Sequence, residues 1–351
     1  MSKNAVTIKD VAARGGVSKT AVSYILSGRQ TGVRISDDTR KRVLAAAQEL
    51  GYHPNALARG LARRQTDTLA LVMQFPAVFS GWSGFTNELM HGATDAATAL
   101  GFDLMLHTKG TGNIEQDVAA LTDGRADGAL LLRDRNDPLS NRLTERSFPF
   151  VQIFSHSTSP DACFVDCDNV AGAKMAVNHL WSLGHRRIGH VAGSSNSAAA
   201  ADRLHGYRDA LEAHGIMPRD DWECSITYAG SDFAPFVEMM SRPGSPTALF
   251  VWSDDVANRA IRVLNEQMGL NVPQDISVIG FDGTQMCDQT TPRLSSIRQP
   301  IYKMAAHGVK TLVSLLRHEP LSERNIVFTP TLELRDSSSF APQPSGRNTD
   351  S

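Results

Sequence analysis

The stretch TIKDVAARGGVSKTAVSYILSG, residues 7–28, carries two short helical patterns separated by a pair of glycines. Thr7 and Asp10 have the spacing of a capping box, so we expect a first helix to begin directly after Thr7. The run RGGV, residues 14–17, ends this helix because glycine adopts the left-handed backbone of helix ends without a steric penalty. Ser18 is then placed to cap a second helix.

The second helix has an apolar side and a polar side. The apolar positions, which we expect to pack on the first helix, are Ala21, Val22, Ile25 and Leu26. The polar positions, which point elsewhere, are Lys19, Thr20, Ser23 and Tyr24. A third helix is expected from Ser36 to about Leu50, with Gly51 ending it. This pattern predicts a helix-turn-helix unit, whose second helix enters the DNA major groove.

The charge of the chain is unevenly distributed. Residues 1–65 contain 12 lysines and arginines against 4 aspartates and glutamates, whereas the rest of the chain contains 23 against 33. A basic head on an acidic body favours contact between the head and a polyanion. Charge alone leaves open a basic face that is merely solvated, but the helix-turn-helix pattern in the same residues favours DNA.

The residues that follow the third helix, ELGYHPNALARGLARRQT at 49–66, form a basic linker. Pro54 favours a helix start, and residues 55–64 are expected to form a short helix. Because that helix is too short to be stable in water by itself, we expect it to fold on meeting DNA and a partner copy. Leu61 is of the apolar type that wedges between base pairs in the minor groove and kinks the duplex.

The order and spacing of these motifs, together with RVLAAAQELGYHPNALARGLA at 42–62, resemble the LacI/GalR (lactose-repressor) family of bacterial transcription regulators. The resemblance implies that the second helix is the recognition helix and that residues 54–63 are the hinge helix. It also implies that Ala58 meets the minor groove and that Leu61 intercalates. The expected DNA-contacting residues are Thr7, Ser18, Lys19, Thr20, Ser23, Tyr24, Asn55, Ala58 and Leu61.

Beyond residue 66 the sequence alternates strand and helix patterns, beginning with TLALVMQF at 68–75 and GFTNELMHGATDAATALG at 84–101. Such alternation predicts parallel sheets with helices on both faces. About 270 residues exceed one comfortable core, so two α/β lobes are expected. The expected fold is an all-α helix-turn-helix head with a hinge helix, joined to a two-lobe α/β body with parallel sheets.

The resemblance implies that this body is periplasmic-binding-protein-like and that the chain crosses between its lobes near Cys167, Ile297 and Phe328. The expected segments are a head at 1–52, a hinge at 53–66, a body at 67–335 and a tail at 336–351. Lobe 1 is expected at about 67–167 and 298–328, and lobe 2 at about 168–297 and 329–335. The tail is rich in Ser, Pro and Gly and is expected to be disordered.

Ligands of such folds bind beyond the carboxyl ends of the strands, between the lobes. A hydroxyl-rich ligand such as a sugar needs a forked donor, a carboxylate and an apolar ring face. Arg203 and Asp282 follow strands and resemble the ligand-binding arginine and aspartate of the family. The other candidates are Trp82, Phe85, Phe233, Trp252, Ser253 and Asp254. An arginine that pairs with an acid, and aromatic rings that belong to the core, are the alternatives.

Two places depart from the family pattern. Phe154 and Ser155 end the strand PFVQIF where many relatives carry an aspartate, and Arg133 and Arg135 follow a strand where small polar residues are commoner. Both departures argue against the simplest neutral sugar. The two arginines serve a phosphorylated or acidic ligand in one interpretation and lie in a solvated loop in the other, which we favour.

The resemblance therefore implies a sequence-specific repressor whose operator affinity is switched by a small-molecule effector, a sugar or sugar derivative. The tail lacks the leucine heptads of a tetramerising helix, so we expect a homodimer on a near-palindromic operator. In this hypothesis the effector closes the lobes and the hinge helices melt, because the effector favours the state that binds DNA poorly. The alternative is a corepressor, which strengthens operator binding, as in some relatives.

Other classes of protein fit the sequence less well. The start MSKNAVTIKD lacks the apolar core of a secretion signal, and we expect a cytoplasmic protein on the bacterial nucleoid, not a transport-type binding protein or a membrane protein. Dinucleotide, G-x-S-x-G and phosphate-loop motifs are missing, so we expect no enzyme and no catalytic residue. The four cysteines are expected to be free thiols, with no zinc and no cofactor.

Overall fold

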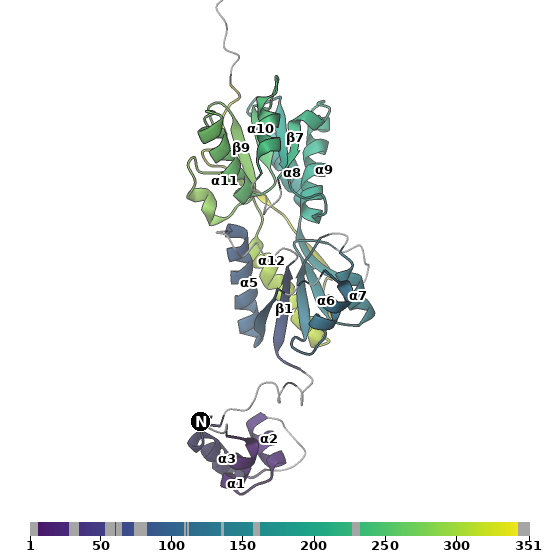
Figure 1. Cartoon of the computed structure of the whole chain (residues 1–351), viewed down its shortest axis with the longest axis vertical. Coiled ribbons are helices and arrows are strands. Elements are labelled where there is room, and N and C mark those ends of the chain that lie inside the picture. The colour runs from purple at the N-terminus through teal and green to yellow at the C-terminus, as the bar shows by residue number, and fades with distance from the viewer. Residues whose placement is uncertain are drawn as a thin grey trace, which may run out of the picture. The chain divides into compact units, whose positions relative to one another are not determined.

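A computed structural model describes residues 6–27, 35–52, 60, 65–73, 83–108, 110, 112–134, 137–156, 162–226 and 232–342. The chain divides into two compact units, residues 1–67 and 68–351, and each is described by itself (Figure 1). Within the described ranges, the helices are too short or too polar to span a membrane.

The first unit is a head of three helices. They are α1 (Ile8–Gly15), α2 (Lys19–Ser27) and α3 (Asp37–Glu49). The Asp10 carboxylate accepts hydrogen bonds from the N–H (2.8 Å) and the hydroxyl (2.7 Å) of Thr7, and Gly16 ends α1 at a φ of 63°. The hydroxyl oxygens of Ser18 and Ser36 accept backbone N–H groups in the first turns of α2 and α3. The caps and helices predicted for the head are confirmed.

The three helices of the head enclose a small apolar core. Its buried side chains are Val11, Ala12, Val22, Ile25, Val43, Ala46 and Ala47. A Cβ on Gly15 would lie 3.3 Å from the Val43 side chain, so α1 and α3 approach each other closely at this point. Ala21 and Leu26, which were expected to pack inward with Val22, are only half-buried because they lie at the margins of the inner stripe.

Lobe 1 is built on a six-stranded parallel sheet with the strand order β11-β5-β4-β3-β1-β2. The strands are β1 (Thr68–Met73), β2 (Asp103–His107), β3 (Gly128–Leu132), β4 (Phe150–Ile153), β5 (Cys163–Cys167) and β11 (Asn325–Phe328). The helices are α5 (Gly84–Leu100), α6 (Ile114–Leu121), α7 (Leu139–Glu145) and α12 (Ile301–Leu316). Along β1, Leu69 and Leu71 pack with α5 and α12, whereas Ala70 and Val72 pack with α6 and α7. A strand buried on both faces explains why its sequence is continuously apolar.

Lobe 2 repeats this plan with the strand order β12-β10-β9-β8-β6-β7, in which only the β10–β12 pair is antiparallel among the described strands. The strands are β6 (Ile188–Ala192), β7 (Glu223–Ser225), β8 (Ala248–Val251), β9 (Ser277–Asp282), β10 (Ser295–Arg298) and β12 (Thr331–Glu333). The helices are α8 (Asn169–Ser182), α9 (Ala198–Ala213), α10 (Ala234–Ser241) and α11 (Asp254–Arg262), with a π-helical turn at Val263–Gln267 and 3₁₀ turns at Asp220–Trp222 and Gln285–Asp288. Ile279 and Phe281 of β9 pack with α8 and α9, and Val278 packs with α10 and α11.

The chain passes between the two sheets three times. It leaves the first sheet after Cys167, returns to it through α12 after Arg298, and leaves it again after Phe328. Each lobe is therefore assembled from segments that are far apart in the sequence. The two sheets with helices on both faces confirm the predicted fold class.

The expectation that the tail is disordered from residue 336 onward is wrong for residues 336–342. Ser337 is fully buried. It lies beside β9, one residue before the position at which β10 starts to pair with β9. Its carbonyl accepts the N–H of Val278 at 2.7 Å, and its hydroxyl donates to the Val278 carbonyl at 2.7 Å. Serine-rich composition did not reveal this segment, because its hydroxyls are used to pair the open backbone groups of β9. Residues 343–351 lie outside the described part of the chain.

A histidine in the centre of lobe 2 makes the free energy of unfolding depend on pH. His190 on β6 is fully buried between Tyr207 and Phe250, whose rings lie 5.0 and 4.8 Å from its own. Its Nδ1 lies 2.9 Å from the Phe250 carbonyl, and its Nε2 has no partner among the described residues. Burial lowers the pKa of His190 from 6.5 to about 4, because the charged ring would lose its hydration.

We expect the free energy of unfolding to fall as the pH decreases, because the unfolded chain takes up a proton at His190 near pH 6.5 while the folded chain resists it down to about pH 4. Equilibrium urea unfolding should show a loss of about 2 kcal/mol from this residue between about pH 7 and pH 5. In His190→Phe, which keeps a ring in the stack but does not titrate, the pH dependence should decrease by that amount. An unchanged dependence would contradict the prediction.

Candidate functional site

The polar side of α2 is exposed in the head. Ser18, Lys19, Thr20 and Ser23 are exposed, and Tyr24 is half-buried. The Ser18 oxygen accepts the N–H of Ala21 at 3.1 Å, so this residue both caps α2 and lies at the start of its exposed side. Thr7 is exposed at the start of α1 and is bonded to Asp10. The other expected DNA contacts, Asn55, Ala58 and Leu61, lie outside the described residues.

In the body, the carboxyl ends of the strands of the two lobes face each other. Gly84, which follows β1 in lobe 1, contacts Thr284, which follows β9 in lobe 2. His156, which follows β4, lies 3.9 Å from Asp202 at the start of α9 (Nδ1 to Oδ2) and 3.3 Å from Asp166 on β5. Polar groups at the strand ends are thus brought together between the lobes, where ligands of parallel α/β folds bind.

Arg203 lies at this edge on α9, and the residue is 3% exposed. Its Nε donates to Oδ1 of Asn169 at 2.9 Å, and its Nη1 donates to the Trp252 carbonyl. The guanidinium carbon lies 3.6 Å from the centre of the Phe281 ring. These three contacts fix the plane of the guanidinium group.

Asp282 ends β9 and faces Arg203, with 3.8 Å between Oδ1 and Nη1. Its Oδ1 also accepts the side-chain amide of Gln299 at 2.7 Å. Burial raises the pKa of Asp282 well above its usual value, and the positive charge of Arg203 opposes this. Burial correspondingly lowers the pKa of Arg203, with Asp282 opposing the change.

One side-chain atom of each member of this ion pair is not used in the hydrogen bonds described above. No hydrogen bond within the described part of the chain uses Nη2 of Arg203 or Oδ2 of Asp282. A fixed donor and a fixed acceptor, side by side in a water-poor site, can bind neighbouring hydroxyl groups. The structure thus shows Arg203 beside an acid, as the alternative interpretation has it, and ligand binding by the pair stays a prediction.

The other candidate ligand-binding residues near β8 of lobe 2 make hydrogen bonds within that lobe. Ser253 caps α11 by accepting the Val256 N–H at 3.4 Å, and Asp254 accepts three donors from its own lobe. Trp252 is half-buried, and its indole N–H donates to the Ile226 carbonyl at 2.9 Å.

The aromatic candidates lie in both lobes. Phe233 is half-buried beneath the guanidinium of Arg259, 5.4 Å from the ring centre. Phe85 lies edge-on to Phe154 with 4.8 Å between ring centres, and Trp82 is outside the described residues. Phe154 holds a φ of 56°, which is unusual for a bulky residue, and Ser155 beside it has a buried hydroxyl with no partner among the described residues.

The solvated-loop interpretation of Arg133 is wrong. Its side chain is only 15% exposed, and its Nε and Nη2 donate to one oxygen of Asp137 at 3.0 and 2.6 Å. The other Asp137 oxygen caps α7 by accepting the Leu139 N–H at 2.8 Å. An acid four residues later therefore neutralises the arginine within the loop. Arg135 lies outside the described residues.

Three residues that hold the central pair were not selected from the sequence. Asn169 begins α8, Gln299 follows β10, and Phe281 precedes Asp282. Asn169 and Gln299 lie where the chain passes between the lobes, so their signal was a polar residue within two positions of the end of a crossing strand. Phe281 has the sequence signature of an ordinary core residue, and it belongs to the same buried cluster as Ile297 and Tyr207.

Comparison with known proteins identifies the family. The model of the bacterial regulatory proteins of the lacI family matches residues 7–55, and that of the periplasmic binding protein-like domain matches residues 177–338. The HTH-type transcriptional regulator CelR of Thermobifida fusca is 33% identical over 338 residues, which are 94% of this chain and 98% of CelR. The chain belongs to the LacI family of transcription regulators. Members of this family are regulators and not enzymes, so the expectation of no enzyme is confirmed.

Further relatives agree with this assignment of a LacI-family regulator. The HTH-type regulator AscG of Escherichia coli is 33% identical over 317 residues, covering 88% of this chain and 92% of AscG. The structure of a CelR–cellobiose complex covers 95% of this chain and 100% of its own, at 30% identity and a TM-score of 0.72. The lac repressor dimer bound to operator and the anti-inducer ONPF covers 96% and 100%, at 26% identity and a TM-score of 0.82.

Replacing Asn169 tests the support beneath Arg203. We expect Asn169→Ala to lower the free energy of unfolding by about 1–3 kcal/mol, because the Nε–H of Arg203 is left buried without an acceptor. Asn178→Ala is the matched control on the same helix, since Asn178 is exposed and its partner His214 can bond to water. Urea unfolding of both variants measures the difference, and equal losses would argue against the assigned role.

Proposed function

We propose that this LacI-family regulator is a homodimeric, cytoplasmic repressor that reads a near-palindromic operator with α2. The exposed polar side of α2 is the observation that carries the proposal: Ser18, Lys19, Thr20 and Ser23 lie together at the start of the second helix of a helix-turn-helix unit. Side chains at this place reach base edges in the major groove, and Thr7 and Tyr24 add contacts nearby. The lac repressor, bound to operator as a dimer, supports the same arrangement.

We further propose that Asn55, Ala58 and Leu61 meet the minor groove, and that a hydroxyl-rich effector, a sugar or sugar derivative, binds between the lobes. Arg203 would donate through Nη2 and Asp282 would accept through Oδ2, with Phe85, Phe233, Trp82 and Trp252 supplying apolar faces. The cellobiose in the CelR complex supports this class of ligand. Effector binding favours the state that releases the operator.

In vitro selection from random duplex DNA tests operator reading. The purified protein should enrich a near-palindrome, because a twofold dimer presents two copies of α2. Lys19→Ala should then weaken binding to the selected site by about 1–3 kcal/mol more than binding to unrelated DNA. Lys9→Ala, which removes the same charge from an exposed position on α1, should weaken both equally. Selection without a motif, with and without metabolite extract, would refute the proposal.

The buried carboxylate of Asp282 leads to a second prediction, which concerns the release of protons when the effector binds. Because effector hydroxyls donate to the ionised form of Asp282, binding lowers its raised pKa, releases protons and grows tighter as the pH rises. Calorimetry of cellobiose and ribose in two buffers of different ionisation enthalpy measures the release. Asp282→Asn should abolish the release and weaken binding roughly ten- to hundredfold. Tight binding of a sugar without proton release would contradict the role of Asp282.

A further inference from the structure

The turn Asp282–Thr284, which begins at the last residue of β9, touches both the candidate effector site and the opposite lobe. Its first residue, Asp282, faces Arg203, and its last, Thr284, packs against Gly84 at the start of α5. A Cβ added to Gly84 would overlap Oγ1 of Thr284 and lie 2.6 Å from its Cβ. The lobes thus approach each other at this point to a distance that only glycine permits.

The backbone of this turn adopts conformations that side chains rarely hold. Asp282 has a φ of 119° and Gly283 a φ of 67°. A Cβ added to Gly283 would overlap the Cα of Arg298, where the chain passes between the lobes. Such a backbone persists only when its surroundings hold it.

A buried carboxylate on α11 supplies this support. Asp254 is 6% exposed and accepts hydrogen bonds from the Thr284 N–H (3.2 Å), the Ser296 hydroxyl (2.6 Å) and the Cys287 thiol (3.1 Å). The Ser296 oxygen in turn accepts the Gly283 N–H at 3.1 Å. Gly280 lets β9 pass against Asp254, because a Cβ there would overlap its Oδ1. The Asp254 carboxylate is occupied by hydrogen-bond donors of its own lobe, which leaves it poorly suited to contact an effector.

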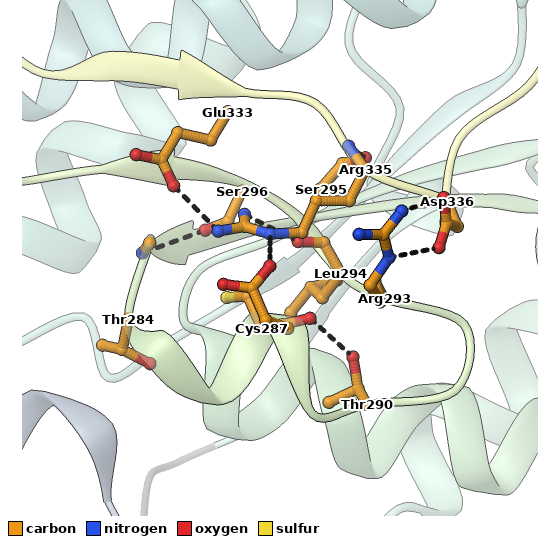
Figure 2. Close-up of polar contacts among 12 residues, drawn as sticks. Thr284, Cys287, Thr290, Arg293, Leu294, Ser295, Ser296, Glu333, Arg335 and Asp336 are labelled. Carbon is orange, nitrogen blue, oxygen red and sulfur yellow. Dashed lines mark hydrogen bonds and ion pairs between the residues drawn. The ribbon is translucent and has the colours of Figure 1, made fainter.

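The segment that follows the turn is tied down as well. Figure 2 shows Arg335 above the 3₁₀ turn at Gln285–Asp288, where Arg335 donates to Asp288 at 2.6 Å, to Glu333 at 2.9 Å and to the Leu294 carbonyl at 3.1 Å. Beside it, Arg293 pairs with Asp336 at 2.7 Å. These contacts anchor the segment that follows the turn to the rest of lobe 2.

We propose that the Asp282–Thr284 turn, held by Asp254, couples the effector site to the approach of the lobes at the Gly84–Thr284 contact. Asp254 is a positioning residue in this arrangement, not an effector ligand. The coupling rests on the proposed function of Asp282, whereas the steric contact does not.

Exchanging the sizes of the two contacting residues tests the steric contact without an effector. The four proteins are wild type, Gly84→Ala, Thr284→Gly and the double variant, studied as full-length chains by amide hydrogen exchange. Gly84→Ala should speed exchange in residues 84–90 and 283–288 by about tenfold, and the double variant should restore it. Helix propensity alone predicts the opposite sign, since alanine favours α5 over glycine. Gly110→Ala is the control, because a Cβ there meets open space.

Asp254→Asn tests the support of the turn. The amide cannot accept all three donors, so exchange in residues 283–288 should rise by about tenfold. Asp255→Asn, the same charge change one residue along α11, should leave exchange unaltered. With cellobiose as probe, Asp254→Asn should also move the pH dependence of binding to lower pH, because the charge of Asp254 contributes to the raised pKa of Asp282.

The outcomes separate the two proposals. A double variant that exchanges as fast as Gly84→Ala, or unchanged exchange in Asp254→Asn, would overturn the coupling turn. If Asp254→Asn does not fold, the size exchange decides alone. If cellobiose does not bind the wild type while the exchange results hold, the steric contact stands and the sugar proposal fails.

Discussion

A buried pair of opposite charges dominates the body of this protein. Arg203 and Asp282 lie 3.8 Å apart with almost no exposure to water, and each has lost the hydration that its charge would otherwise have. Asn169, Gln299 and the Phe281 ring replace part of that hydration. Because they do so incompletely, the effector proposed above would complete that replacement with its own hydroxyl groups.

Close approaches of the backbone are the second requirement of this architecture. Gly172 lies against Phe281, Gly206 against α8, and Gly84 against the other lobe, each at a separation that excludes a side chain. These glycines let helices pack directly on the sheet and let one lobe reach the other. Glycine loses more conformational entropy on folding than other residues, and the protein accepts this cost at positions that pack near Asp282.

Local patterns predicted the local features of the fold well. The caps at Thr7 and Ser18 and the strand at 68–73 depend on neighbours within a few residues, which the sequence displays directly. Arg203 and Asp282 were each selected through strand ends and resemblance, whereas their pairing with each other was not predicted. Asn169 and Asp254 were missed or assigned another role, because what they bond to is set by segments more than thirty residues away. The same holds for Ser337, whose partner Val278 could not be inferred from a polar tail.

The position of the last strands has a consequence for how the protein is made. β11 completes the first sheet, and β12 with residues 336–341 completes the second, so both lobes need residues from 325–341. On the ribosome, neither lobe can close its sheet until these residues have emerged, whereas the three-helix head needs only the first fifty or so residues. The DNA-reading unit therefore has all of its contacts available long before the body that regulates it can respond to anything.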